Sequence, residues 1–199
     1  AFRSQNPGPA SLPDGLGGLA LRPQIVGTMD AVLRDSAVTG LTTACLVVQF
    51  DDADVLLDRH GRAAQTEVLA RSSERLCSAL RDGDTVARLE GGGFAVALAG
   101  VRRIDLETMV QLSARLQAAL APPISLNAIR LYISCSIGFC LGPRAPMPSG
   151  ASLLDAAQVA ADEARRNGPG AIRAYAADMA RKRSDRDAFR NVLEKALDE

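Results

Sequence analysis

The chain has 199 residues, enough for one domain with a single core and too few for two domains of ordinary size. Apolar residues make up 47% and charged residues 23%, close to the globular average, which excludes disorder over the whole length. Basic and acidic residues both total 23, so the formal net charge of zero disfavours a nucleic-acid partner or an anionic membrane.

The cysteines favour a reducing compartment. Cys45, Cys77, Cys135 and Cys140 lie inside apolar runs without CxxC spacing, and His60 is the only imidazole, so we expect buried, reduced thiols in a cytoplasmic protein. No signal peptide opens the chain and no apolar run approaches the length of a membrane span, so we expect no membrane segment here. The start at Ala1 rather than Met indicates a segment of something longer.

The first residues predict an arm and then a helix. Residues 4–23 carry Pro and Gly at a density that prevents a continuous helix or a central strand. From about Pro23 to Asp35 a helix is expected, because proline suits a first helical position and apolar residues recur on one side. Those residues are Ile25, Val26, Met29 and Leu33.

Residues 42–50 form a continuous apolar run rich in β-formers, which predicts a central strand covered on both faces. Acidic residues follow it, and we interpret them as a solvated turn and helix start, where acids suit the helix dipole. They are Asp51, Asp52, Asp54 and Asp58. Apolar residues at helical spacing then predict a helix over 62–81.

Three consecutive glycines between two short apolar runs predict a β-hairpin with a tight tip. The strands are expected at about 86–89 and 94–98, and the tip is Glu90-Gly91-Gly92-Gly93-Phe94. Glycine reaches positive φ without a steric penalty, and a tip without Cβ atoms lets a ligand approach the backbone closely.

The second half predicts two more helices and two more strands. We expect an amphipathic helix over 105–120 that buries one apolar face, and an alternating strand over 129–141. The buried face is expected to hold Leu106, Met109, Val110, Leu116 and Leu120. After a Pro-rich loop come a helix over 151–166, an edge strand over 171–175 and an exposed charged helix over 177–199. The order strand, helix, strand, strand, helix, strand indicates an α+β fold with a ferredoxin-like βαββαβ core and extra helices.

The hairpin resembles the signature turn of the GGDEF domains, the diguanylate cyclase family. In register, Glu90 stands at the first Gly of that motif, Gly91 at the second, Gly92 at the metal-binding acid, Gly93 at the Glu and Phe94 at the Phe. Two other stretches support the resemblance: residues 14–22 resemble the entry motif Asp-x-Leu-Thr-Gly-Leu-x-Asn-Arg, and residues 134–138 resemble its Ala-Ser-Ile-Gly strand.

The resemblance implies an active site that this chain has largely lost. Aligned on Gly61, the family's metal-binding Asp falls on Gln49, and its two guanine-reading residues fall on Leu57 and Thr66. A shift of one or two residues would instead bring Asp51 into the metal position.

The family's phosphate-binding Lys corresponds to Arg165, a possible phosphate contact, whereas its Arg is replaced by Pro169. We therefore expect no metal, no cofactor and no catalysis. Magnesium enters only under the alternative of an active cyclase, in which Glu90 would supply the missing carboxylate.

Arg81 and Asp84 have the spacing of the family's inhibitory site, where an Arg-x-x-Asp binds cyclic di-GMP. A guanidinium suits phosphate or the guanine O6/N7 edge, and a carboxylate accepts from guanine N1 and N2. The other interpretation is a helix end followed by an ordinary turn. A complete site also needs a second arginine, for which Arg102 and Arg103 are the candidates.

The sequence thus predicts an N-terminal arm or linker at 1–13, a degenerate GGDEF domain at 14–176 and a linker helix at 177–199. The expected function is regulation of an attached output domain, such as an EAL phosphodiesterase, in bacterial cyclic di-GMP signalling. The domain would act by packing, with a homodimer as one form, or by binding cyclic di-GMP or GTP. The alternative is an active diguanylate cyclase that makes cyclic di-GMP from two GTP.

Overall fold

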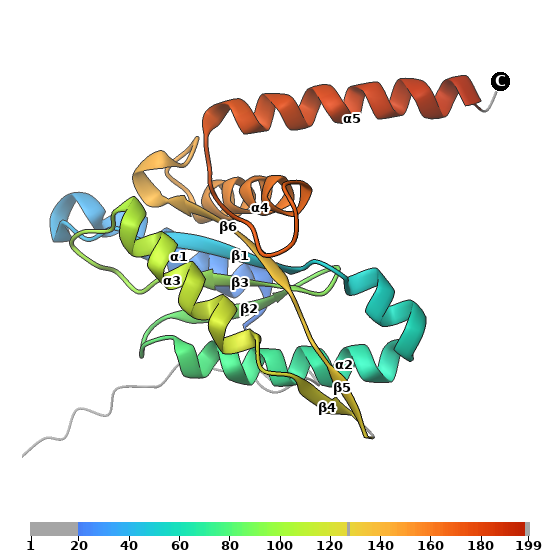
Figure 1. Cartoon of the computed structure of the whole chain (residues 1–199). Helices are drawn as coiled ribbons and strands as arrows, with labels where there is room; N and C mark the ends of the chain where they lie inside the picture. The colour runs from blue at the N-terminus through green and yellow to red at the C-terminus, as the bar shows by residue number, and fades with distance from the viewer. Residues whose placement is uncertain (1–19, 127, 198–199) are drawn as a thin grey trace, which may run out of the picture.

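A five-stranded sheet with helices on both faces forms the body of the molecule (Figure 1). The computed structural model describes residues 20–126 and 128–197, so the predicted arm at 1–13 and most of the entry motif at 14–22 lie outside the described residues. The strands of the sheet are β1 (Ala44–Phe50), β2 (Thr85–Leu89), β3 (Gly93–Ala97), β6 (Cys135–Leu141) and β7 (Ile172–Ala174). Their order is β2-β3-β1-β6-β7, antiparallel except for the parallel pair of β6 with β7.

The helices complete the predicted topology. They are α1 (Arg22–Thr39), α2 (Ala53–Ala79), α3 (Leu106–Leu120), α4 (Gly150–Arg166) and α5 (Ala177–Leu197), with a 3-10 turn η1 at Gly142–Arg144. A separate two-stranded hairpin joins β4 (Ile124–Leu126) to β5 (Ile129–Leu131). The path β1-α2-β2-β3-α3-β6 is the predicted ferredoxin-like βαββαβ core, so the α+β fold class is confirmed.

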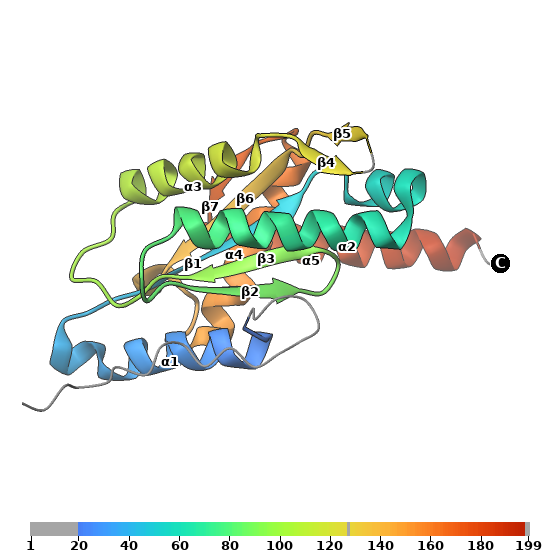
Figure 2. The same ribbon diagram turned by 90° about the horizontal axis from the view of Figure 1, so that it is seen from below.

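Strand β1 divides the core into two layers. Leu46, Val48 and Phe50 belong to the cluster that packs with α2 and α3, whereas Cys45 and Val47 belong to the cluster that packs with α1 and α4. Both faces of β1 are therefore buried, which explains the continuous apolar run. Figure 2 shows α2 and α3 on the same side of the sheet.

Several predicted elements have different bounds in the structure. Helix α1 runs from Arg22 to Thr39, four residues beyond the predicted end. Helix α2 begins at Ala53 rather than at residue 62 and contains one non-helical residue, Gly61, at φ 79° and ψ 175°. The acid-rich stretch, expected to be a turn and a helix start, forms a turn at 51–52 and the first turns of α2. The predicted strand over 129–141 is divided into β5 and β6, and the β4–β5 hairpin was not predicted.

The buried face of α3 also differs from the prediction. Leu106 is 54% exposed and Val110 is 42% exposed, whereas Met109, Leu116 and Leu120 are buried as expected. The buried stripe runs through Ser113 instead, whose hydroxyl donates to the carbonyl of Met109 at 2.8 Å and so meets its hydrogen-bonding requirement inside the core.

Three of the four cysteines match the predicted buried, reduced thiols. Cys45, Cys135 and Cys140 are buried and free, but Cys77 is exposed because α2 turns the face with Val68, Leu69 and Leu76 toward the core. Burial raises the pKa of Cys135 and of Cys140 to about 12, so these thiols stay protonated and unreactive. Within the described ranges, none of the helices combines the length and the apolar character needed to span a bilayer.

Candidate functional site

The glycine turn closes the β2–β3 hairpin as predicted. Leu89 pairs with Gly93 across the hairpin, which leaves Glu90, Gly91 and Gly92 as the turn. Gly91 has φ 85° and Gly92 has φ 90°, values that favour glycine. Phe94 anchors the turn from inside, since it is fully buried and its ring lies 6.0 Å from that of Phe50 in an edge-to-face arrangement.

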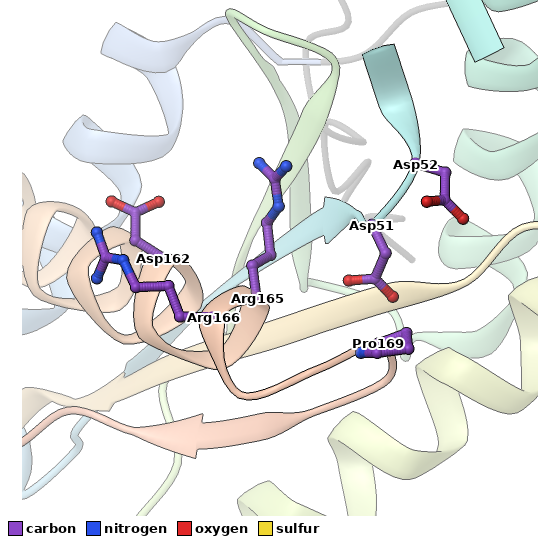
Figure 3. A pocket seen from close by; sticks show the side chains of 6 residues that line it. All are labelled: Asp51, Asp52, Asp162, Arg165, Arg166 and Pro169. Carbon is purple, nitrogen blue, oxygen red and sulfur yellow. The ribbon is translucent and has the colours of Figure 1, made fainter. Parts of the chain in front are cut away.

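Two cavities lie side by side between this turn and the end of α4. The first, which we call the turn cavity, has a volume of about 150 Å³ and is lined by Gln49, Gln158, Arg165 and the turn residues 90–93, among others. The second, which we call the arginine cavity, has a volume of about 460 Å³ (Figure 3). It is lined by Asp51, Asp52, Asp162, Arg165, Arg166 and Pro169. Arg165 lines both cavities, so its charge faces the space beside the turn.

Gln49, which stands at the metal position of the resemblance, is held by α4. Its Nε2 donates to Oδ1 of Asp162 at 2.9 Å, and Gln158 donates to the same oxygen at 3.0 Å. Oε1 of Gln49 is buried and finds no hydrogen-bond partner within the part of the chain that the structure describes. The sequence analysis did not identify Asp162 or Gln158, and their four-residue spacing on one helix was the only signal that pointed to them.

Asp51 was expected to lie in a solvated turn, but its carboxylate connects three segments of the structure by hydrogen bonds. The expectation is therefore wrong for this residue. Its carboxylate accepts hydrogen bonds from the hydroxyls of Ser134 and Ser136, the latter at 2.5 Å, and from the backbone N–H of Gly170 at 3.0 Å. The cause is the approach of β6 and of the loop after α4 to the end of β1. The expectation holds for Asp52, Asp54 and Asp58, which are exposed.

The residues present do not fit the magnesium ion that the resemblance implies. Gly92 offers no side-chain oxygen, Gln49 offers only the neutral amide oxygen Oε1 in place of a carboxylate, and Asp51 already accepts three hydrogen bonds. Among the described residues, no cluster of three or more His, Cys, Asp or Glu is placed to hold a metal. Magnesium prefers carboxylate oxygens in near-octahedral geometry, which this arrangement does not provide.

The positions that would read a guanine base are also changed. Leu57 is 36% exposed and has no polar side-chain atom. The hydroxyl of Thr66 donates to the carbonyl of Arg62, one turn earlier in α2, at 3.0 Å. Leu57 therefore offers no acceptor for guanine N1 and N2, and Thr66 offers only a neutral hydroxyl oxygen in place of a carboxylate.

Arg81 and Asp84 lie at the other end of β2 from the glycine turn. Asp84 has a side chain only 2% exposed and accepts from the backbone N–H of Ala99 at 2.9 Å and of Arg81 at 3.3 Å. The guanidinium of Arg81 is 56% exposed, with its Nε 3.5 Å from Oδ1 of Asp84. Arg102 and Arg103, the candidates for a second arginine, are exposed on the segment that follows Ala99.

A family model described as diguanylate cyclase, GGDEF domain matches residues 11–170. The chain belongs to the GGDEF family. The match runs from the arm to the loop after α4 and thus contains the whole sheet except β7. This GGDEF domain is of the kind found in bacterial cyclic di-GMP signalling proteins.

Two relatives from Pseudomonas aeruginosa are much longer than this chain, which spans only part of their length. The diguanylate cyclase TpbB of Pseudomonas aeruginosa is 32% identical over 162 residues, which cover 80% of this chain and 36% of TpbB. The cyclic di-GMP phosphodiesterase NbdA of the same species is 32% identical over 130 residues, which cover 65% of this chain and 16% of NbdA.

A solved structure that contains only the GGDEF domain of TpbB shares the fold of this chain. It superposes with a TM-score of 0.79 at 30% identity and covers 86% of this chain and 98% of that one. The likeness therefore concerns the GGDEF domain itself.

Proposed function

We propose that this GGDEF domain is a non-catalytic regulatory module, which controls an attached output domain by packing or by binding cyclic di-GMP or GTP. The observation that carries the proposal is Gln49, whose amide donates to Asp162 at 2.9 Å where a metal-binding carboxylate would be needed. Phosphoryl transfer relies on positioning and on neutralisation of phosphate charge, so the loss of several kcal/mol of this stabilisation would remove several powers of ten in rate.

The test is incubation of the chain with GTP and magnesium, followed by a chromatographic search for cyclic di-GMP. An active diguanylate cyclase serves as the positive control for the assay. We expect no product above the level of a blank without protein. Product formed by this chain would contradict the proposal and favour the alternative, an active cyclase. Loss of that product in Glu90→Gln would then identify Glu90 as the substitute carboxylate.

Binding of cyclic di-GMP is the first form of the proposed regulation, at Arg81 and Asp84. The exposed guanidinium of Arg81 remains free to contact phosphate or guanine, whereas buried Asp84 mainly supports the backbone of Ala99. Arg81→Ala is therefore the cleaner probe, because a change at Asp84 would also disturb folding.

Calorimetry with cyclic di-GMP measures this binding. We expect heat from the unmodified chain and none from Arg81→Ala. Arg71→Ala is the matched control, since Arg71 is also 56% exposed and, among the residues the structure describes, pairs only with Glu67 and Glu74 on α2. An unmodified chain that gives no heat would exclude this form, and equal heat from Arg81→Ala would move the site elsewhere.

Regulation by packing is the second form. The greater length of TpbB and NbdA supports an attached domain, and the name of NbdA makes a phosphodiesterase, such as one of the EAL type, the first candidate. This form predicts a dimer, or a neighbour with altered activity, that depends on α5. A chain without residues 184–199 that keeps the same mass in solution and leaves the neighbour's activity unchanged would argue against it.

A further inference from the structure

Helix α5 lies on α4 and extends past the body of the molecule (Figure 1). Two of its arginines contact two consecutive acids on α4. Nη1 of Arg183 is 3.6 Å from Oδ2 of Asp162, and Nη2 of Arg186 is 3.0 Å from Oε2 of Glu163. These carboxylates are 29% and 22% exposed, so the contacts are only partly screened by solvent.

One of these contacts continues into the candidate site. Asp162 uses one oxygen toward Arg183 and the other to accept from Gln49 and Gln158. Gln49 and Gln158 both line the turn cavity. Three residues, Arg183, Asp162 and Gln49, therefore form a series of direct polar contacts that leads from α5 to the wall of the turn cavity.

The interface between α5 and α4 has the features of a contact that can dissociate. An open groove of about 520 Å³ lies between the helices beside Arg183, and Phe189 is 66% exposed. Nε of Arg186 is buried without a hydrogen-bond partner among the described residues, which costs stability. None of the described residues of α5 belongs to either core cluster, and together with the unsatisfied donor of Arg186 this places α5 at the low-stability end of the structure.

Arg183 also has a second partner available. Its Nε lies 4.0 Å from Oδ2 of Asp187 on α5 itself, so the guanidinium keeps an acidic neighbour if α5 leaves α4. Release of α5 then does not leave this cation unpaired. Asp162, by contrast, loses the one cation that faces its Oδ2 in the described structure.

We propose that α5 is a conformational control element, whose seating on α4 sets the geometry of the turn cavity through Arg183, Asp162 and Gln49. When α5 is seated, Arg183 holds Asp162 in the orientation that fixes the amide of Gln49. When α5 is displaced, Asp162 and Gln49 become free to reorient, and the end of β1 and the adjacent turn become more mobile. The device does not depend on which ligand the domain binds, so its test is independent of the proposed function.

The test is amide hydrogen exchange measured by mass spectrometry on the full chain. The variant Arg183→Gln/Arg186→Gln removes both contacts to α4. We expect exchange about tenfold faster in α5, and a clear increase also in peptides covering 45–53 and 88–95. The control Lys182→Gln/Arg190→Gln removes the same charge from α5, but its partners Asp178 and Asp187 lie on α5 itself. In the control, the peptides at 45–53 and 88–95 keep their rates.

A second variant tests the same link from the other end. Gln49→Met removes the amide without touching α5, and coupling between two sites is reciprocal, so exchange in α5 should rise as well. The proposal is overturned if α5 loosens in the arginine variant while the site peptides are unchanged. It is equally overturned if Gln49→Met leaves the exchange of α5 as it was.

Discussion

At the scale of single residues, Asp51 joins three segments that are far apart in the sequence. Its carboxylate accepts from Ser134, Ser136 and the backbone of Gly170. Hydrogen bonds to a charged group contribute about 1.5–3 kcal/mol each and are not additive, so we expect Asp51→Ala to lower the free energy of unfolding by about 2–4 kcal/mol. Urea denaturation measures this loss.

The neighbouring Asp52 provides the control for that measurement. It is exposed, and its side chain does not cap α2 although it stands at the N-cap position. Asp52→Ala should therefore change the free energy of unfolding by less than about 0.5 kcal/mol. Equal losses in the two variants would show that the acidic stretch acts only through its charge near the helix start, and that the three hydrogen bonds contribute little.

The sequence predicted the chemistry of a site residue wherever the type of amino acid alone determines what its side chain can bind. The sequence itself shows that Gly92 has no side chain and that Leu57 has no polar side-chain atom. The partners of Asp51 and Gln49 were not readable, because Ser134 lies 83 positions from Asp51 and Asp162 lies 113 positions from Gln49. Such pairs depend on which strand ends the fold brings together, and local periodicity carries no information about that.

At the scale of elements, the contact between α4 and β6 depends on Gly138. A Cβ at this position would lie 1.9 Å from the backbone nitrogen of Ala161 and 2.4 Å from the carbonyl carbon of Ala160, so α4 would have to move. Overpacking against backbone allows little relief, and we expect Gly138→Ala to destabilise the fold by about 3 kcal/mol or more. Thermal unfolding followed by circular dichroism measures the change.

Gly27 is the matched control for Gly138. It lies on the exposed side of α1 and a Cβ there would have no neighbour within 4 Å. Gly27→Ala should be neutral or stabilise by about 0.5–1 kcal/mol, because alanine is the better helix former. If Gly138→Ala unfolds at the temperature of the unmodified chain, the close approach of α4 to β6 does not determine stability.

The same scale shows which elements sequence patterns predict well. Long periodic segments such as α4, and the doubly covered strand β1, follow directly from apolar spacing. The β4–β5 strands have three residues each, too few for alternation to be recognised. The apolar pattern predicted that α2 starts at residue 62 rather than at Ala53, because the non-helical Gly61 interrupts that pattern.

At the scale of the whole molecule, the β2–β3 hairpin separates two candidate ligand sites. The glycine turn with Arg165 lies at one end, and Arg81 with Asp84 lies at the other. Five residues of β2 span about 17 Å, so a ligand at one end does not touch the other. Helix α5 contacts the side of α4 that leads to the glycine turn, and its release should therefore affect that end of the hairpin first.

Acid should release α5 before the rest of the molecule unfolds. The hydrogen bond from Arg186 of α5, followed by that from Arg166 of α4, holds the pKa of Glu163 below its usual value of 4.5. Because the pKa of Glu163 is lower when α5 is seated on α4, the charged carboxylate stabilises the seated state fully at any pH above the ordinary pKa of a glutamate. This stabilisation is lost as the pH falls through the lowered pKa of Glu163. We therefore expect the radius of gyration from small-angle scattering to rise as the pH falls below 4.5, while the far-ultraviolet circular dichroism of the core persists.

Two glutamate variants distinguish this cause from general acid expansion. Glu163→Gln removes the titrating group, so α5 should be less firmly seated at neutral pH and the acid-induced step should shrink. Glu67→Gln on α2, whose partner Arg71 lies on the same helix, should leave the step unchanged. A step of equal size in Glu163→Gln would contradict this cause and assign the acid response to other carboxylates.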